Sequence, residues 1–320
     1  MNLTAGQFYL ESYLAPLASW LNRSDITDIY INRPGEIWTE TVGGMIEQHE
    51  VPELDRTALQ RLARQVAAAN AQGINRESPL LAGSLPDGSR IQLVLPPATR
   101  GEVAVAIRRH VVQDLALESY RPPLAGSVGK AESTNKLSPN AAPEDPIAML
   151  RQAVKDRRNI LISGGTSSGK TTFLNTLLRE VPSNERLILI EDAAELQLRH
   201  ANAVGLIAAR GGQGEADVTA EDLLIAALRM RPDRIILGEI RGSEAMTFLR
   251  AVNTGHPGSI TTIHADSPER AIDQLVLLTL QAGSRLGWDD AVHYIRNSID
   301  IVVHLKRENG MRTISAVKLG

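Results

Sequence analysis

The sequence contains no cysteine among its 320 residues, and this absence excludes disulfide bonds, thiolate catalysis and cysteine-ligated zinc. It also fits a protein that works in a reducing cytosol. Aromatic residues account for only 3% of the chain, so we expect no stacking platform for single-stranded nucleic acid. Any chemistry must therefore come from oxygen and nitrogen groups on side chains or on the backbone.

Long apolar runs and a strong net charge are also missing. No segment approaches the roughly 18 apolar residues of a membrane span, and the polar start at residues 1–4 lacks the basic beginning of a signal peptide. A net charge of −3 gives no general attraction to nucleic acids or acidic membranes, and we expect no direct sequence-specific binding of nucleic acid. With 43% hydrophobic and 22% charged residues, the composition predicts a soluble globular protein of the cytoplasm.

A glycine-rich segment is the most informative feature that is present. Residues 164–172 read GGTSSGKTT, which satisfies the phosphate-loop pattern GxxxxGK[ST]. An apolar run at 160–162 precedes the segment, and apolar residues at helical spacing follow it, as a strand–loop–helix unit requires. Such a unit points backbone N–H groups and the positive end of a helix at one spot, where Lys170 reaches the outer phosphates and Thr171 ligates Mg²⁺. The sequence therefore predicts that ATP and Mg²⁺ are held by Gly164, Gly165, Thr166, Ser167, Ser168, Gly169, Lys170, Thr171 and Thr172.

The first section of the chain predicts a small α+β domain over residues 1–118. Alternating residues at 28–32 and 36–40 flank an Arg-Pro-Gly turn and indicate a hairpin. Apolar residues at helical spacing predict a helix from Asp55 to near Gly73, and two further runs predict strands at 90–95 and 102–108. Strands and helices in this mixture favour an α+β arrangement.

The second section predicts a different architecture. Residues 119–145 carry few apolar residues and several Pro, Gly and Ser, so we interpret them as a flexible interdomain linker. Strands and helices then alternate over residues 146–320, with apolar runs at 186–191, 234–239 and 259–263. Because this alternation includes a phosphate loop, we expect a mostly parallel sheet flanked by helices.

Carboxylates and a histidine recur where the predicted parallel strands end. Ligands bind at the carboxyl ends of strands in open α/β sheets, so these side chains are candidates for orienting water and metal. Glu239 is the strongest candidate, although a surface carboxylate after a core strand would look the same. Glu191 and Asp192 either act in catalysis or cap the next turn. His264 either senses the terminal phosphate or is structural, and Arg241 pairs either with phosphate or with Glu239.

Four motifs around these residues resemble the signatures of the type II/type IV secretion ATPase superfamily. They read GGTSSGKTT, LILIEDAAEL, RMRPDRIILGEIRG and TGHPGSITTIHADSPERA, and they are similar in order and spacing to that family's Walker A, Asp box, Walker B and His box. Earlier segments, such as DITDIYINRPGEIWTE and QGINRESPLLAGSLPDGSRIQLVLPP, resemble the conjugation branch, the eleventh component of VirB-type machines. The resemblance covers nearly the whole chain outside the linker.

The resemblance implies a RecA-like ATPase domain and a role for each matching residue. Glu239 would serve the metal and the attacking water, Glu191 would share or hold the role of base, and His264 would report the γ-phosphate. Arg90 and Arg108 match positions at which the family's N-terminal domain places arginines over the nucleotide. Strand-end salt bridges are the alternative for both arginines.

The resemblance also implies partners and a location. Members form hexameric rings, so we expect a homo-hexamer that works with other secretion ATPases and with inner-membrane components. It would lie in the cytoplasm, in peripheral contact with the inner membrane. The sequence leaves open the cargo, the identity of the partners, the subunit whose N-terminal domain covers each nucleotide, and the choice of base between Glu191 and Glu239.

Three functions are compatible with these observations. The first is a ring ATPase that powers type IV secretion or conjugative transfer of proteins or DNA–protein complexes. The second is a type II secretion or pilus motor, which the missing tetracysteine insertion and the N-terminal match disfavour. The third is a nucleotide-gated docking module whose hydrolysis is incidental.

Overall fold

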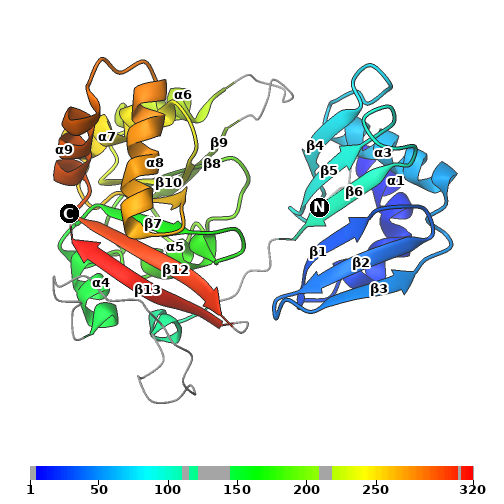
Figure 1. Ribbon diagram of the computed structural model, residues 1–320, viewed down its shortest axis with the longest axis horizontal. Helices are drawn as coiled ribbons and strands as arrows, with labels where there is room; N and C mark the ends of the chain where they lie inside the picture. The colour runs from blue at the N-terminus through cyan, green and yellow to red at the C-terminus, as the bar shows by residue number, and fades with distance from the viewer. Residues whose placement is uncertain (1–4, 110–114, 122–144, 209–217, 309–310, 320) are drawn as a thin grey trace. The chain divides into compact units, whose positions relative to one another are not determined.

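The computed structural model describes residues 5–109, 115–121, 145–208, 218–308 and 311–319. Contacts between Cα atoms divide the chain into two compact units, drawn in Figure 1 with the phosphate-loop unit from green to red. In the described part of the chain, no helix is long and apolar enough to cross a membrane.

The first unit is built on a six-stranded antiparallel sheet with the strand order β3-β2-β1-β6-β5-β4. Its strands are β1 (Ile26–Ile31), β2 (Glu36–Thr41), β3 (Ile46–Glu50), β4 (Leu80–Ser84), β5 (Arg90–Val94) and β6 (Ala104–Arg108). Its helices are α1 (Ala5–Leu14), η1 (Ala15–Leu17), α2 (Ala18–Leu21) and α3 (Arg56–Ala69).

Alternation along the strands decides which face of this sheet is buried. Ile29, Ile107 and Ile91 lie side by side in the register and are buried in a cluster with residues of α3. Their neighbours Asp28 and Arg108 point to the opposite face, because successive side chains of a strand alternate. Helix α3 begins where the sequence indicates, since the Asp55 side chain accepts a hydrogen bond from the Ala58 N–H at 2.7 Å.

The second unit is built on a seven-stranded sheet with the order β13-β12-β7-β11-β10-β8-β9, parallel except for β13. Its strands are β7 (Ile160–Gly164), β8 (Leu187–Glu191), β9 (Ala203–Ile207), β10 (Arg234–Ile240), β11 (Ile260–His264), β12 (Ile301–Glu308) and β13 (Met311–Leu319). Its helices are η2 (Leu117–Tyr120), α4 (Pro146–Lys155), α5 (Lys170–Leu178), α6 (Ala220–Leu228), α7 (Glu244–Asn253), α8 (Pro268–Gln281) and α9 (Trp288–Ser298).

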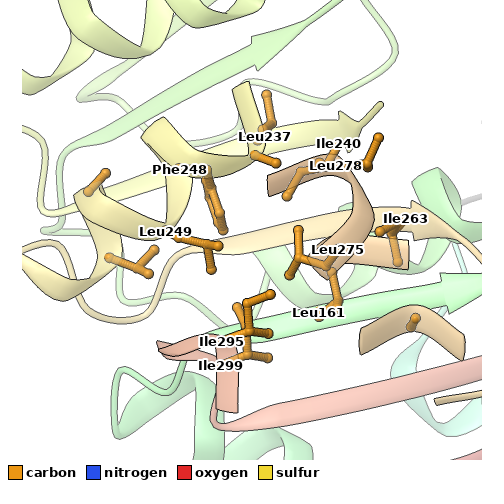
Figure 2. Close-up of a cluster of buried hydrophobic side chains, with 14 of the residues drawn as sticks. Leu161, Leu237, Ile240, Phe248, Leu249, Ile263, Leu275, Leu278, Ile295 and Ile299 are labelled. Carbon is orange, nitrogen blue, oxygen red and sulfur yellow. The ribbon is translucent and has the colours of Figure 1, made fainter. Parts of the chain in front are cut away.

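The central strands of this sheet are apolar on both faces because helices cover both sides. Leu161 belongs to a cluster formed with α6, α7, α8 and α9, whereas its neighbours Ile160 and Ile162 belong to a second cluster formed with α4, α5 and η2. Figure 2 shows the first cluster, where Leu161 and Leu237 from the sheet meet Leu275 and other helical side chains. The mostly parallel α/β fold predicted from the sequence is therefore confirmed.

One segment differs from the prediction. The sequence analysis divided residues 115–121 between the first domain and the linker, but Leu117 and Tyr120 of η2 are buried in the core of the second unit. The Tyr120 ring packs edge-on against Phe173 of α5, with ring centroids 4.8 Å apart. The Thr176 hydroxyl also donates to the Leu115 carbonyl at 3.1 Å. We therefore propose that the second domain begins before Leu115; residues 122–144 of the predicted linker lie outside the described residues.

Candidate nucleotide and catalytic site

The phosphate loop connects β7 to α5, and two of its glycines are required by geometry. A Cβ atom on Gly164 would lie 2.4 Å from the Ser168 Oγ and 2.9 Å from the Leu305 carbonyl oxygen, so no side chain fits there. Gly169 has a φ of +89° and forms the N-cap of α5, a left-handed conformation that favours glycine. The two glycines therefore allow the tight turn that a phosphate loop needs to direct its N–H groups at an anion in front of α5.

Lys170 extends across this loop toward the start of the turn. Its Nζ donates to the carbonyl oxygens of Gly164 at 2.9 Å and Gly165 at 3.2 Å. Burial lowers the pKa of Lys170 from its ordinary value, and the charge of Glu239 partly offsets that effect. A desolvated ammonium group next to N–H groups is an arrangement that attracts the phosphates of a nucleotide.

The sheet register brings the predicted catalytic residues to the same edge. Gly164 pairs in register with His264 of β11 on one side and with Leu305 of β12 on the other. Glu191 ends β8, and Gly238 of β10 lies so close to it that an added Cβ would be 3.2 Å from the Glu191 Cβ. The carboxyl ends of β7, β8, β10 and β11 therefore meet around the phosphate loop, as the sequence predicts.

Glu191 is buried and already holds a loop in place. Its Oε2 accepts hydrogen bonds from the backbone N–H groups of Glu195 and Leu196, both at 2.8 Å. Glu191 is only 8% exposed, so these bonds fix its orientation at the end of β8. The capping role that the sequence left open for this carboxylate is thus observed, which leaves its part in catalysis to be tested.

Glu239 is paired with the side chain of Arg241. The Arg241 guanidinium donates from Nε to Glu239 Oε2 at 2.8 Å, and its Nη1 donates to the Asp192 Oδ2 at 3.1 Å. A second Arg241 nitrogen also contacts Glu239. Arg241 therefore joins a carboxylate near the end of β10 to the carboxylate that follows β8, and of its two predicted partners, phosphate and Glu239, the structure shows Glu239.

Glu244 is a site-adjacent carboxylate that the sequence analysis missed. Its Oε1 accepts hydrogen bonds from the Arg241 N–H and from the Gly242 N–H at 2.8 Å, so it fixes the turn between β10 and α7. Burial raises the pKa of Glu244, with smaller contributions from Asp192 and Glu221. Its position three residues after Arg241 at a helix start is the signal that could have identified it.

The oxygen groups expected to serve Mg²⁺ are few but suitable. Thr171 lies in the first turn of α5, and Glu239 lies near the carboxyl end of β10. Within the described ranges, no cluster of three or more His, Asp or Glu side chains could hold a metal ion by itself. Mg²⁺ in nucleotide sites uses one or two protein oxygens, water and the substrate phosphates, so a hydroxyl and a carboxylate fit that ion.

Arg90 and Arg108 are brought together in the first unit. They form a cross-strand pair between β5 and β6, and Arg108 is also in register with Asp28 of β1. The Arg108 Nε donates to the Asp28 Oδ1 at 3.0 Å, and Asp28 is only 5% exposed. The salt bridge named as an alternative for Arg108 is therefore present, and a role toward nucleotide stays a prediction for both arginines.

These features define the class of the second unit. A buried strand ends in a left-handed glycine turn, a lysine spans the loop, and carboxylates and a histidine occupy the neighbouring strand ends. This is the arrangement of a phosphate-loop nucleoside triphosphatase on a mostly parallel α/β sheet. The chain belongs to the Type II/IV secretion system protein family, whose model matches residues 11–313.

Named relatives come from one branch of this family. The chain is 36% identical to the type IV secretion system protein VirB11 of Bartonella quintana (strain Toulouse), over 95% of this chain and 91% of the relative. It is 38% identical to the type IV secretion system protein PtlH of Bordetella pertussis, over 95% and 92% of the two chains. These relatives confirm the predicted family.

Solved structures agree with the fold. The VirB11 ATPase of the Brucella suis type IV secretion system matches with a TM-score of 0.51 and 36% identity, covering 98% of this chain and 95% of that one. The pilus retraction motor PilT with bound ADP matches with a TM-score of 0.61 but only 18% identity, over 99% and 83% of the two chains, so it shows the fold alone. The chain is thus a secretion ATPase, and its relatives favour the type IV branch over the pilus motor.

Proposed function

We propose that this chain is a cytoplasmic ATPase that binds Mg-ATP at residues 164–172 and uses its hydrolysis to drive type IV secretion or conjugative transfer. One observation carries the proposal: the phosphate loop, Glu239 and His264 converge at one edge of the sheet, with Lys170 close enough to Glu239 for their charges to interact. The 36–38% identity to VirB11 and PtlH proteins supports the transport role.

The phosphate loop supplies binding and electrostatic stabilisation. Backbone N–H groups from Gly165 to Thr172 surround the β- and γ-phosphates, and Lys170 exchanges its two carbonyl partners for phosphate oxygens. The Thr171 hydroxyl and Glu239 would hold Mg²⁺, which would neutralise part of the phosphate charge. His264, beside Gly164 in the register, donates to a γ-phosphate oxygen and so distinguishes ATP from ADP.

We assign the orientation of the attacking water to Glu239 and a positioning role to Glu191. Glu191 uses one oxygen to hold the N–H groups of Glu195 and Leu196, so moving it would break that loop. Glu239 is held by the flexible side chain of Arg241, and phosphate can compete for that guanidinium. Glu239 can therefore turn toward water when Arg241 turns toward nucleotide.

The assembly and the location are expectations that the family resemblance implies. We propose a homo-hexamer that meets other secretion ATPases and inner-membrane components at the cytoplasmic face of the membrane. In this assembly Arg90 and Arg108 would reach a bound nucleotide from the first domain. A ring of this kind converts ordered hydrolysis into motion, which a docking module would not require.

Steady-state ATP turnover and substrate transfer test this function together. Glu239→Gln keeps the shape of the side chain, so we expect unchanged Mg-ATP affinity and a loss of turnover on the order of 10²–10⁴. Glu191→Gln is the matched control, because its amide oxygen still accepts both N–H bonds, and we expect it to keep most of the turnover. Cells in which Glu239→Gln replaces the native chain should lose transfer.

The opposite pattern would overturn these assignments. A Glu239→Gln protein that turns over normally, beside an inactive Glu191→Gln protein, would make Glu191 the base. Normal transfer in cells that carry an inactive Glu239→Gln protein would leave the chain a docking module and not a motor.

A further inference from the structure

Arg312 of β13 lies against the phosphate loop, although it is more than 140 positions away in the sequence. A Cβ atom built on Gly169 would be 2.5 Å from the Arg312 Cδ, 2.9 Å from its Nε and 3.4 Å from its Cζ. Gly169 is the left-handed residue that immediately precedes Lys170. The Arg312 side chain therefore packs against the left-handed turn at Gly169.

The strand register explains how a C-terminal hairpin reaches this place. Leu305 of β12 is in register with Gly164, the last residue of β7, and β12 continues to Glu308. Arg312 pairs with Arg307, two residues beyond Leu305. The hairpin of β12 and β13 thus extends beyond the end of β7, and Arg312 lies in this extension, beside the phosphate loop.

The Arg312 side chain is partly shielded from solvent. Ile314, two residues along the same strand, is buried in the cluster that includes η2 and α5, so Arg312 projects from the same face. Burial lowers the pKa of Arg312 from its ordinary value; Tyr120 offsets part of this effect and Arg307 adds to it. Tyr120 of η2 is itself buried. A half-buried cation thus lies between η2 and the loop.

We propose that Arg312 is a positioning residue of the nucleotide site: its side chain packs across Gly169, which holds the left-handed turn, and places a positive charge beside the bound polyphosphate. This inference rests on the proposed binding of ATP at residues 164–172. A cation kept out of water interacts more strongly with phosphate than a solvated one does. Because the charge acts on bound nucleotide before and during hydrolysis alike, its loss weakens binding and leaves the chemical step nearly unchanged.

Three variants separate the charge from the packing. Arg312→Met keeps an unbranched apolar stem without the charge, Arg312→Lys keeps the charge, and Arg307→Met removes the charge of the cross-strand neighbour. Mg-ATP affinity is measured by calorimetry at two salt concentrations, together with KM, kcat and the Tm of the nucleotide-free protein. If Arg312→Met does not fold, Arg312→Gln takes its place.

For Arg312→Met we expect about a tenfold rise in Kd and KM, which corresponds to about 1.4 kcal/mol. We also expect kcat within about twofold, an unchanged Tm and a weaker dependence of Kd on salt, since one phosphate-facing charge is gone. Arg312→Lys should recover most of the affinity, and Arg307→Met should bind like the wild type.

Several results would overturn the role of Arg312. These are wild-type affinity in Arg312→Met, an equal loss in Arg307→Met, or a fall in Tm with unchanged KM, which is what a purely structural side chain gives. A failure of the proposed function looks different, because then the wild-type protein itself binds no Mg-ATP. If the wild type binds and Lys170→Ala does not, while Arg312→Met binds normally, only the inference about Arg312 fails.

Discussion

Arg241 contacts two carboxylates of the candidate site at once, Glu239 and Asp192. Its guanidinium contacts Glu239, near the end of β10, and Asp192, which follows the neighbouring strand β8, and nearly half of its side chain is exposed. An exposed ion pair of this kind contributes little stability, so its exchange for a phosphate contact costs little. Arg241 is therefore suited to couple the arrival of nucleotide to the release of Glu239.

Glu244, which fixes the turn that carries Arg241, gives a prediction about pH. Burial raises its folded-state pKa above the ordinary value of 4.5, so the folded protein holds the proton more tightly than the unfolded chain does. The favourable contribution is complete below the unfolded pKa and is lost as the pH rises through the folded pKa. Glu244→Gln keeps an oxygen that accepts both N–H bonds and has no charge to desolvate.

We therefore expect Glu244→Gln to raise the Tm at pH 8 relative to the wild type, with the difference shrinking toward pH 4.5. Calorimetric melting of both proteins across this range measures the effect. Thr279→Val removes a buried hydroxyl that donates to the Leu275 carbonyl within α8, so it serves as a control that shifts the Tm equally at every pH. A Glu244→Gln protein that is less stable by a constant amount would show that hydrogen bonding, and not burial, decides.

Single residues differ in how far the sequence could predict them. The loop residues and Glu239 follow from local patterns, because a phosphate loop and a strand end are encoded by adjacent positions. Arg312 and the contact of Arg241 with Asp192 depend on register, which joins positions far apart in the chain. No spacing rule in one sequence reports such contacts.

Secondary structure elements show the same division. The central strands β7, β8 and β10 were predicted because burial on both faces makes their sequences almost wholly apolar. The edge strands β3, β4 and β9 were missed, since each is partly exposed and its sequence lacks a clear period. Their place is decided by pairing with a neighbour, which sequence propensity does not record.

Helix η2 illustrates an element that only tertiary packing explains. Its four residues form no period, yet Leu117 and Tyr120 are buried beside α5. The sequence analysis divided this segment between a domain and a linker because the neighbouring residues are rich in Pro, Gly and Ser. The aromatic contact with Phe173 shows that it belongs with the phosphate-loop helix.

For the whole molecule, the proposal requires communication between the first domain and the nucleotide. Arg108 is held by Asp28 in the structure, so two variants can separate a structural role from a functional one. We expect Arg108→Ala to lower ATP turnover and to abolish any compaction that a non-hydrolysable ATP analogue induces in small-angle scattering. Asp28→Asn breaks the ion pair and keeps the arginine, so we expect it to keep turnover and compaction.

Equal losses of Tm in both variants, with turnover and scattering unchanged, would make this ion pair structural and the first domain a passive platform. A wild-type scattering profile that is the same with and without the analogue would also contradict the proposal that the first domain responds to nucleotide.

Nucleotide binding at residues 164–172 is the claim on which the rest of this account depends, and calorimetry of Lys170→Ala tests it most directly. The Lys170 charge offsets phosphate charge inside the backbone loop. In the protein itself the Lys170 side chain contacts the carbonyls of Gly164 and Gly165, so we expect its removal to leave the fold intact. Lys155→Ala, at an exposed position at the end of α4, is the control. We predict that wild type and Lys155→Ala bind Mg-ATP at low micromolar protein and that Lys170→Ala gives no binding heat at an unchanged Tm. Equal affinity in all three proteins would contradict the account.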